Sequence, residues 1–573
     1  MRIAFACVIV FVVCVQLRIS QFGHTYGHHM PQHKLEVVTK VVAASVQPQK
    51  DEASVQLRGS SPQHPPLLGA SVAHQNKSSP ARGSTKTTTV ITQRPTTTQK
   101  PALVAPSPAA AAFGPREQQR ADAVRDALRH LWRGYKQTAW GADEVAPISG
   151  HRGGSWGEVG MLILDTLDTL WIAGLKDEFL EGQNWVQSMT FHRLGHASRT
   201  SLFEMTIRGL AGLLAAHALS GRAVFLDKAK MLGDSLMFGF PQEGVHGRNA
   251  WPVSYIDVHN PSDMEVTPSF HQGYTTLADA GSNLVELSYL SQACGDKRYK
   301  ASADLVMKQI LDLSERTRRP LAARTLDPYS VAFESGSTSV GALADSYFEY
   351  LLKGYLQSGR KNHRLLKAWK EAMREMKQTL VGKSGDGLSF IMEDSGHHNT
   401  MDHLTCFIGG MLALGSQYVP AEEVEAWWLP LAKDLTYTCH EMYRRTESGL
   451  APEISSFGQT MNAQSRHYRL RPETLESLFY MFRVTGNETY REWSWDIFQA
   501  INKHTRTNYG FAAVEDVDTV PVSLRDSEET FMGAETLKYA LLVHLPPEAL
   551  PLDRFVLNTE AHPVLIDGTI ANS

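Results

Sequence analysis

Apolar residues recur at helical spacing from about residue 116 to the C-terminus. Stretches at 223–238, 297–314, 362–380, 421–445 and 488–506 carry them at positions i, i+3 and i+4. This spacing is typical of helices that bury one face and leave the other in water. Strand-like alternation of apolar and polar residues is scarce. The pattern therefore predicts a domain that is almost wholly helical.

A second set of helices is predicted between these, and it is much more apolar. Each member begins near an acidic residue. The predicted members are 162–174, 203–221, 278–295, 344–359, 401–415, 472–486 and 534–545. A helix that is apolar all round belongs in the interior of a fold. We therefore expect these helices to form an inner layer that the amphipathic helices surround.

Helix ends repeat along the chain as well. A glycine stands four residues before an aromatic residue in the pairs Gly221–Phe225, Gly295–Tyr299 and Gly486–Tyr490. Such a glycine can adopt the left-handed conformation that ends a helix, and the aromatic residue then anchors the next helix. An apolar helix, a glycine stop and an amphipathic helix alternate in this way about seven times. The repeat predicts an all-α toroid of seven inner and seven outer helices.

In such a toroid the acidic starts of the inner helices gather at one end. Carboxylates are also common at helix N-termini because they interact favourably with the helix dipole, which explains some of them. The outer helices begin with mixed charge, however, so a shared acidic pocket is the better interpretation. Such a pocket can bind a hard divalent cation through oxygen, or supply an acid and a base for cleavage of a glycosidic bond. The sequence has no HExxH or CxxC pattern, which argues against zinc.

The N-terminal segment differs in composition from the rest. No Phe, Tyr or Trp occurs between Gly27 and Ala112, whereas all 11 Trp residues lie at or beyond Trp132. A segment without aromatic residues buries too little apolar surface to offset the entropy lost on ordering. We therefore expect a disordered stalk rich in Ser, Thr and Pro at 23–115 and a folded domain at 116–573.

An apolar run at 3–17 follows Arg2 and is shorter than a full membrane span. It predicts a signal anchor at 1–22, with a cleaved signal peptide as the alternative. Anchor, stalk and globular domain together predict a type II membrane protein whose domain lies in a lumen. Asn76-Lys77-Ser78 and Asn487-Glu488-Thr489 match the acceptor pattern for N-glycans.

Cysteine usage fits an oxidising lumen. Cys7 and Cys14 lie in the apolar run, so Cys294, Cys406 and Cys439 remain for the domain. Three thiols allow at most one disulfide. We favour a Cys406–Cys439 bridge, which would stabilise the domain by roughly 3–4 kcal/mol by the chain-entropy argument. Three buried free thiols are the alternative.

The charge balance excludes one class of partner. The 573 residues include 60 acidic and 56 basic side chains, a formal net charge of -4. A nucleic-acid groove needs a marked excess of positive charge, so we expect no nucleic-acid partner. With 42% hydrophobic residues, the chain has ample material for a large core.

Several blocks of the domain combine acidic and aromatic residues in a fixed order. They are 164–172 (LDTLDTLWI), 202–208 (LFEMTIR), 344–350 (ADSYFEY), 401–407 (MDHLTCF), 470–480 (LRPETLESLFY), 535–539 (ETLKY) and 558–563 (NTEAHP). Together they closely resemble the class I α1,2-mannosidases of glycoside hydrolase family 47. The resemblance covers nearly all of 125–565, and the ordered set is far more specific than any single block. It implies an (α/α)7 barrel, which agrees with the repeat described above.

The resemblance implies an inverting hydrolase that removes terminal α1,2-linked mannose from high-mannose N-glycans. Glu204 matches the general acid, acting through a water, and Glu473 matches the base that activates the attacking water. Asp345 matches the third catalytic carboxylate, and the division of the acid's role between Glu204 and Asp345 stays open. Inversion requires room for a water between acid and base.

The resemblance also implies calcium as the cofactor. Thr559 matches the residue that holds the ion through its hydroxyl and carbonyl oxygens, and waters complete the shell. The acids that match this shell are Glu473, Glu476, Glu535 and Glu560. The matching substrate contacts are Arg208, Asp279, His403, Glu453, Arg471 and Phe531. Cys406 and Cys439 match the family's disulfide.

Three positions depart from the family pattern. Leu343 stands where members that remove one particular mannose have arginine, so we expect a wider cavity that admits several α1,2 linkages. Asp279 is one methylene shorter than the usual glutamate, which weakens the sugar contact there. Gly533 stands in place of a larger apolar residue, so the pocket wall beside it is not predicted.

A glycan-binding quality-control lectin of the same fold is the alternative from another class. Such relatives usually lack the MDHLTCF block, and here 401–407 is intact, as is the catalytic set. The enzyme is therefore the favoured interpretation. We expect a monomer in the Golgi or endoplasmic reticulum membrane, with the catalytic domain in the lumen, and a secreted form if the stalk is cleaved.

Overall fold

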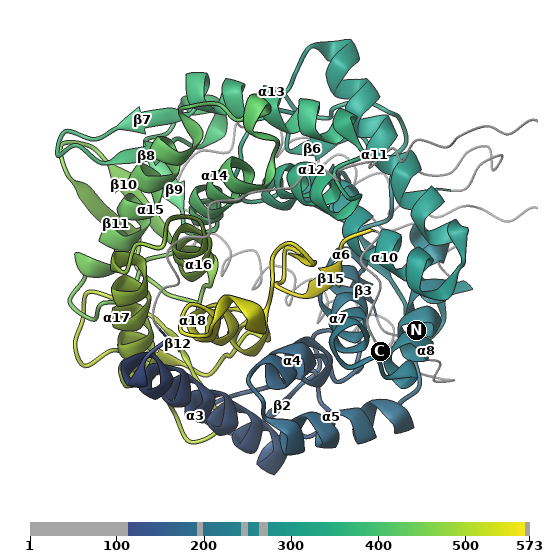
Figure 1. The fold of residues 1–573 in the computed structure, drawn as a ribbon, viewed down its shortest axis with the longest axis vertical. Coiled ribbons are helices and arrows are strands. Elements are labelled where there is room, and N and C mark those ends of the chain that lie inside the picture. The colour runs from purple at the N-terminus through teal and green to yellow at the C-terminus, as the bar shows by residue number, and fades with distance from the viewer. Residues whose placement is uncertain (1–112, 192–198, 242–249, 263–272, 568–573) are drawn as a thin grey trace, which may run out of the picture. The chain divides into compact units, whose positions relative to one another are not determined.

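Helices alternate between inner and outer positions around a ring (Figure 1). The computed structural model describes residues 113–191, 199–241, 250–262 and 273–567. In that part of the chain, seven inner helical segments alternate with seven outer helices, as the repeat predicts. The expected anchor at 1–22 and the acceptor Asn76 lie outside the described residues, as does the expected stalk apart from its last positions.

The inner segments are apolar on all sides. In α4 every residue from Met161 to Leu170 is buried, including Asp165 and Asp168. The inner segments are α4 (Met161–Ile172), α6 and α7 (Leu202–Glu204 and Ala211–Ser220, joined by a π-helical turn at Met205–Leu210), α9 and α10 (Leu277–Gly281 and Leu284–Cys294), α12 (Asp345–Gln357), α14 (Phe407–Tyr418), α16 (Glu473–Thr485) and α18 (Leu537–Leu542, after a π-helical turn at Met532–Thr536). Close packing between them needs small residues. A side chain at Gly212 on α7 would meet the Leu164 carbonyl of α4 at 2.1 Å.

The outer helices each bury one face against the inner layer. They are α3 (Pro115–Thr138), α5 (Lys176–Ser188), α8 (Ala223–Leu236), α11 (Lys297–Thr317), α13 (His363–Thr379), α15 (Trp428–Arg444) and α17 (Thr489–His504). The apolar pattern predicts five of these and misses α3 and α5. Only Phe179, Gly182 and Val186 are buried in α5, too few to give a clear periodic signal.

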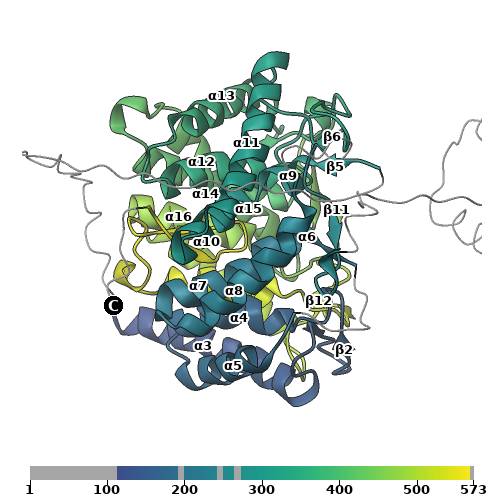
Figure 2. The same ribbon diagram turned by 90° about the vertical axis from the view of Figure 1, so that its right-hand side faces the viewer.

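Short antiparallel strands link the helices. The pairs are β1 (Glu144–Val145) with β2 (Arg152–Gly153), β3 (Thr200–Ser201) with β4 (Tyr255–Ile256), β5 (Thr275–Thr276) with β6 (Thr325–Leu326), β7 (Val381–Lys383) with β8 (Ser389–Ile391), β12 (Ala513–Val514) with β13 (Leu524–Arg525), and β14 (Phe555–Leu557) with β15 (Pro563–Leu565). A three-stranded sheet has the order β11 (Met461–Ser465), β10 (Ile454–Phe457), β9 (Thr400–Asp402). Figure 2 shows β2, β5, β6, β11 and β12 at the end of the ring where the inner helices begin.

The β14–β15 hairpin lies inside the ring of inner helices (Figure 1). Its strands are paired from Phe555↔Leu565 to Leu557↔Pro563, and they pack against α7, α10 and α12. The turn between the two strands, residues 558–562, therefore comes from the C-terminal end of the chain to the interior of the barrel.

The predicted glycine stops are confirmed. Gly221, Gly295 and Gly486 all have left-handed backbone conformations, with φ of 68°, 74° and 65°. The aromatic residues that follow them are buried in the core, namely Phe225, Tyr299 and Tyr490. Each pair therefore ends an inner helix and fixes the start of the outer helix that follows.

Two predicted helix starts are wrong. The inner helix expected from residue 401 begins at Phe407, because Thr400–Asp402 forms strand β9 and pairs with β10. The Asp402 carboxylate accepts hydrogen bonds from the backbone N–H and the hydroxyl of Thr405 at 2.9 and 2.8 Å, so it stabilises a turn before the helix. The outer helix expected from residue 421 begins at Trp428.

One helix among the described residues, Leu202–Ser220, is long and apolar enough to cross a membrane. It is the inner segment formed by α6 and α7, and 72% of its most apolar window is buried inside the protein. Its apolar character is that of a core helix.

Candidate active site

A cavity of about 480 Å³ is lined by residues from the starts of the inner helices. Its acidic lining residues are Glu204, Asp279, Asp345, Glu349, Glu473, Glu476, Glu535 and Glu560. Asp345 and Glu473 are the first residues of α12 and α16, where the helix dipole favours a carboxylate. The shared acidic pocket is therefore confirmed for five of the predicted helix starts, whereas the acids of two others, Asp165 with Asp168 and Asp402, do not line it.

Two inner segments reach the cavity through π-helical turns. Arg208 lies in the turn at Met205–Leu210, and Glu535 lies in the turn at Met532–Thr536. A π-helical turn adds a residue to the helical repeat and reorients the side chains around it, and such turns are frequent at functional sites. Nothing in the sequence spacing signals them.

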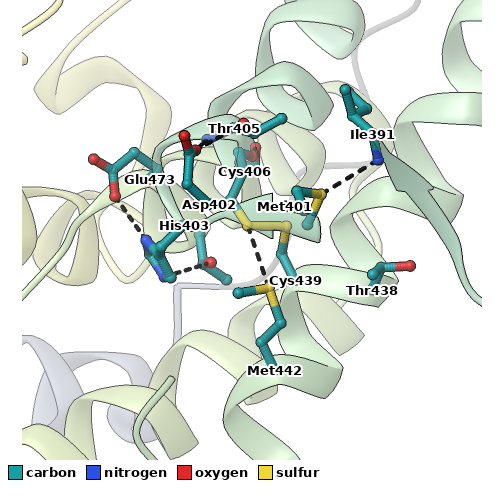
Figure 3. The surroundings of a disulfide bond; sticks show 12 residues. Ile391, Met401, Asp402, His403, Thr405, Cys406, Thr438, Cys439, Met442 and Glu473 are labelled. Carbon is teal, nitrogen blue, oxygen red and sulfur yellow. Dashed lines mark hydrogen bonds and ion pairs between the residues drawn. A yellow bond between two sulfur atoms is a disulfide. The ribbon is translucent and has the colours of Figure 1, made fainter. Parts of the chain in front are cut away.

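Glu473 is held by a buried histidine (Figure 3). His403 Nδ1 lies 2.8 Å from Glu473 Oε2, and because a carboxylate can only accept, the ring N–H donates. On the other side of the ring, Nε2 faces the hydroxyls of Tyr443 and Thr474 at 3.1 and 3.2 Å. Burial opposes ionisation of Glu473. The hydrogen bond and charge of His403, with the charge of Arg471, outweigh burial and lower the pKa of Glu473.

Glu204 is paired with Arg208 on the same helix face. Arg208 Nε donates to Glu204 Oε2 at 2.7 Å, and Nη1 donates to the Thr530 hydroxyl at 3.1 Å and to the Glu560 carboxylate. The guanidinium also lies 5.3 Å from the Trp156 ring centre. Burial alone would lower the pKa of Arg208, but the surrounding carboxylates outweigh it and raise that pKa well above its ordinary value.

Asp345 lies in a different electrostatic environment. Burial raises its pKa to about 8, and the charges of Asp402, Glu349 and Glu473 act in the same direction. The Ser346 N–H, which donates to Asp345 Oδ1 at 2.9 Å, opposes the rise without reversing it. Asp345 therefore carries a proton at neutral pH, whereas Glu473 does not. A cavity that separates the pKa values of two carboxyl groups in this way is suited to acid–base chemistry.

We call Thr559, Glu476, Glu535 and Glu560 the cavity floor. Burial raises the pKa of Glu476 to about 8. Burial also raises the pKa values of Glu535 and Glu560 well above the ordinary range, and repulsion between carboxylates adds to the effect. A nearby cation would stabilise the ionised form of these buried carboxyl groups. Because all these donors are oxygens, they fit calcium and not zinc.

The carboxylates of the cavity floor do not form a compact set of metal ligands by themselves. Among the described residues, no group of three or more His, Cys, Asp or Glu side chains converges on one metal position.

Aromatic and cationic groups form another part of the lining. Two guanidinium groups, those of Arg208 and Arg471, each lie 5.6 Å from the centre of the Phe531 ring. Arg471 is oriented by Glu453, whose Oε2 accepts from Arg471 Nε and Nη2, both at 3.0 Å. An apolar ring face next to donors that point in fixed directions suits a sugar ring with its hydroxyls.

Two of the predicted substrate contacts do not line the cavity. His403 lies behind Glu473, and Glu453 lies behind Arg471, so both orient side chains that reach the cavity. Several lining residues were not predicted, among them Glu349 and Trp156. Glu349 faces the cavity one helical turn after Asp345, a spacing that could have signalled it, whereas the position of Trp156 in the loop before α4 could not be inferred.

The favoured disulfide is confirmed (Figure 3). Cys406 and Cys439 are bonded and link the turn before α14 to α15, while Cys294 is free. The bridge lies close along the chain to His403, and Figure 3 shows both beside Glu473. It therefore fixes the backbone that positions His403.

Comparison with known proteins agrees with this geometry. The profile of glycosyl hydrolase family 47 matches residues 127–566. The chain belongs to glycosyl hydrolase family 47. It is 37% identical over 470 residues to a mannosyl-oligosaccharide 1,2-alpha-mannosidase of Arabidopsis thaliana, covering 79% of this chain and 80% of that protein.

Two further mannosidases are also similar to this chain. The chain is 37% identical over 464 residues to the endoplasmic reticulum mannosyl-oligosaccharide 1,2-alpha-mannosidase of Homo sapiens, covering 78% of this chain and 64% of that protein. The structure of an alpha-1,2-mannosidase from Trichoderma reesei superposes with a TM-score of 0.71 and 25% identity, over 78% of this chain and 99% of the other. The (α/α)7 fold expected from the sequence is confirmed.

The three departures from the family 47 pattern have different structural consequences. Leu343 lines the cavity with a left-handed backbone, φ 75°, an unfavourable conformation for a branched residue. Asp279 also lines the cavity, where its Oδ2 accepts a hydrogen bond from the Ser254 hydroxyl at 3.1 Å. Gly533 packs against α4, because a side chain there would come within 2.8 Å of the Thr166 hydroxyl.

Proposed function

We propose that this family 47 protein hydrolyses terminal α1,2-linked mannose from high-mannose N-glycans with inversion of configuration. Its relatives carry the name mannosyl-oligosaccharide 1,2-alpha-mannosidase. The observation that carries the proposal is the pair formed by Glu473, whose pKa is lowered, and Asp345, whose pKa is raised to about 8, in one cavity. One accepts a proton and the other donates one at the same pH.

In the proposed reaction, Glu473 takes a proton from a water that attacks the anomeric carbon. Asp345 gives its proton to the oxygen of the leaving sugar as the glycosidic bond breaks. We assign donation to Asp345 because the second candidate, Glu204, already accepts a hydrogen bond from Arg208 on Oε2. Glu204 then orients the leaving group or a bridging water. His403 keeps Glu473 in place as its charge changes.

We further propose that the reaction depends on calcium. Thr559 would hold the ion through its hydroxyl and carbonyl oxygens, with waters bridging to Glu476, Glu535 and Glu560. The bound ion supplies a centre that binds sugar hydroxyls and fixes the ring in position. The raised pKa values of these carboxyl groups support a cation at this place.

The lining also suggests which linkages are cut. Leu343 lines the cavity with an apolar side chain where an arginine would add a bulky charge, so we propose that several α1,2-linked residues of one glycan can enter. Phe531 and Arg471 form a surface for the terminal sugar. We propose a monomer with its domain in the lumen of the Golgi or endoplasmic reticulum, attached through the N-terminal segment.

The stereochemistry of the product tests the mechanism. Purified full-length protein is mixed with an α1,2-linked mannose disaccharide in D2O, and proton NMR follows the anomer that is released first. Inversion predicts β-mannose, which then equilibrates with the α form. Release of α-mannose first would overturn the roles of Glu473 and Asp345. Binding without release would favour a glycan-binding lectin of this fold.

A further inference from the structure

The turn that carries Thr559 is held in a strained shape. Residues Asn558–Ala561 form a tight turn in which the Ala561 N–H donates to the Asn558 carbonyl at 3.3 Å. Ala561 has a left-handed backbone with φ 59°, which costs an alanine about 1–2 kcal/mol. A strained turn persists only where its surroundings fix it.

The Asn558 side chain orients the peptide group next to Thr559. Its Oδ1 accepts hydrogen bonds from the N–H groups of Glu560 and His562 at 2.9 and 2.8 Å. Because the carbonyl and N–H of a trans peptide point in opposite directions, the Glu560 N–H bond directs the Thr559 carbonyl away from Asn558. Asn558 Nδ2 is itself fixed, since it donates to Glu286 Oε1 at 2.8 Å.

Two buried lysines bind the two ends of this turn. Lys353 of α12 donates to the Asn558 carbonyl at 3.0 Å, and Lys538 of α18 donates to the Ala561 carbonyl at 2.7 Å. Their exposed fractions are 1% and 0%. Neither lysine lines the cavity, so neither is placed to contact a substrate. We call this pair the lysine clamp.

Each lysine of the clamp also pairs with a carboxylate. Lys353 contacts Glu349 and lies 3.7 Å from Glu476, and Lys538 donates to Asp168 Oδ2 at 2.6 Å. Burying an ammonium group costs several kcal/mol even when it is paired. Charge balance alone would not require both ammonium groups to reach carbonyls of the same turn.

We propose that Lys353 and Lys538 are positioning residues that hold Thr559 in the geometry that binds calcium. The inference rests on the proposed calcium site and adds to it the residues that pre-form the site. Lys353 fixes the Asn558–Thr559 peptide plane on one side of Thr559, and Lys538 anchors the far end of the turn at the Ala561–His562 peptide. The plane on the other side of Thr559 is held by the bond from the Glu560 N–H to Asn558. A side chain that orients a metal ligand is expected to change metal affinity 10–100-fold when it is removed.

Calcium affinity of the full-length protein tests the clamp directly. Lys353→Met and Lys538→Met keep the aliphatic stem and remove the donor. After treatment with chelator, each protein is titrated with calcium chloride in a calorimeter, and its melting temperature is recorded with and without the ion. We expect the calcium Kd to rise at least 10-fold in both variants, and the calcium-dependent rise in melting temperature to shrink.

Arg491→Met is the matched control for loss of a buried cation. Arg491 is 1% exposed, pairs with Glu488 and donates to the Val543 carbonyl at 2.9 Å, but it lies on the outer helix α17. We expect this variant to melt at a lower temperature while its calcium Kd stays within about 2-fold of the original protein, since its partners do not touch the turn.

Asp168→Asn separates the clamp from charge balance. The asparagine can still accept from Lys538, so the bond to the Ala561 carbonyl is kept while one carboxylate charge is lost. We expect a smaller rise in calcium Kd than for Lys538→Met. If Lys538→Met does not fold, the double variant Lys538→Met/Asp168→Asn leaves no unpaired buried carboxylate, and its Kd is compared with that of Asp168→Asn.

Two results would overturn the clamp. One is a calcium Kd within 2-fold of the original in both lysine variants, and the other is an equal rise in Lys538→Met and Asp168→Asn. If the unmodified protein itself shows neither calcium heat nor a calcium-dependent melting shift, the proposed calcium site fails and the clamp fails with it. If the unmodified protein binds calcium and both lysine variants bind it with the same Kd, the proposed calcium site stands and only the clamp is overturned.

Discussion

Two buried ionic clusters in this protein balance their charges in opposite ways. At the outer wall, Glu117 of α3 accepts from His544 Nδ1 at 2.6 Å and from Arg116 Nε at 2.7 Å, and Arg491 lies 3.7 Å away. Burial would raise the pKa of Glu117, but these donors outweigh it and lower that pKa. At the cavity floor, burial and repulsion raise the pKa values of Glu535 and Glu560 instead.

The difference separates a structural cluster from a functional one. The Glu117 cluster joins the first outer helix, α3, to Arg491 of α17 and to His544 after α18, and the arginines of the protein itself balance its charge. The cavity floor holds more carboxyl groups than the protein's nearby cations neutralise. Groups with pKa values displaced in this way mark sites where a proton, a cation or a substrate completes the charge balance.

The largest expected effect is on turnover, from Glu473→Gln. The amide cannot accept a proton from water, so we expect kcat to fall by about 10²–10⁴-fold while glycan binding persists. Single-turnover kinetics and direct glycan binding measure the two separately. Activity close to that of the original protein would remove Glu473 from the role of base.

Asp345→Asn should lower kcat by a comparable or smaller factor and should change the pH profile. In the original protein the proton on Asp345, whose pKa is raised to about 8, is lost as pH rises through that value. The activity should therefore fall on the basic side near pH 8. On the acid side it should fall only below the ordinary glutamate range, because the pKa of Glu473 is lowered. The variant should lose the basic limb, and a limb that persists unchanged would point to Glu204 as the donor.

At the outer wall, Glu117→Gln should affect stability and spare catalysis. Removing one charge from this buried cluster should lower the free energy of unfolding by about 3 kcal/mol at pH 7. Because the pKa of Glu117 is lowered in the folded protein, its contribution is present above pH 4.5 and is lost as pH falls through the lowered value. Urea unfolding of both proteins at two pH values measures this, and kcat of the folded variant should match the original. If the folded variant lost most of its kcat, the Glu117 cluster would have a role in catalysis and would not be purely structural.

The smallest expected effect comes from Leu343→Arg in the cavity lining. A guanidinium there narrows the cavity and adds directional donors, so we expect the first mannose to be removed at a similar rate and later ones several-fold more slowly. Mass spectra of timed digests measure the product series. An unchanged series would show that Leu343 does not set the range of linkages.

Sequence predicted the parts of the fold that depend on local spacing. The glycines at the ends of α7, α10 and α16 and the carboxylates that begin α12 and α16 were all predicted, because a helix end and its first turn are defined by neighbours in the chain. The start of α14 was not predicted. Asp402 looks like a helix cap in the sequence, but it lies in strand β9, which pairs with the distant strand β10, and its side chain stabilises a turn before the helix.

Sequence could not show which charged groups lie behind the cavity. The pattern places α12 and α18 in the inner layer, but lysine is almost always at the surface, so the sequence did not indicate what the buried Lys353 and Lys538 bind. Their partners, the carbonyls of Asn558 and Ala561, lie far away in sequence and reach them only through the β14–β15 hairpin. The same holds for Asp165 and Asp168, which lie within the inner helix α4 and bind His562 instead of lining the cavity.

The proposed function is tested most directly by digestion of a nine-mannose N-glycan with the full-length protein, in calcium or in chelator, followed by mass spectrometry. We expect several hexoses to be lost in calcium and the glycan to stay intact in chelator. Calcium should restore the activity of chelator-treated protein. Tight binding of the glycan with no loss of hexose, whether or not calcium is present, would contradict the assignment as a hydrolase.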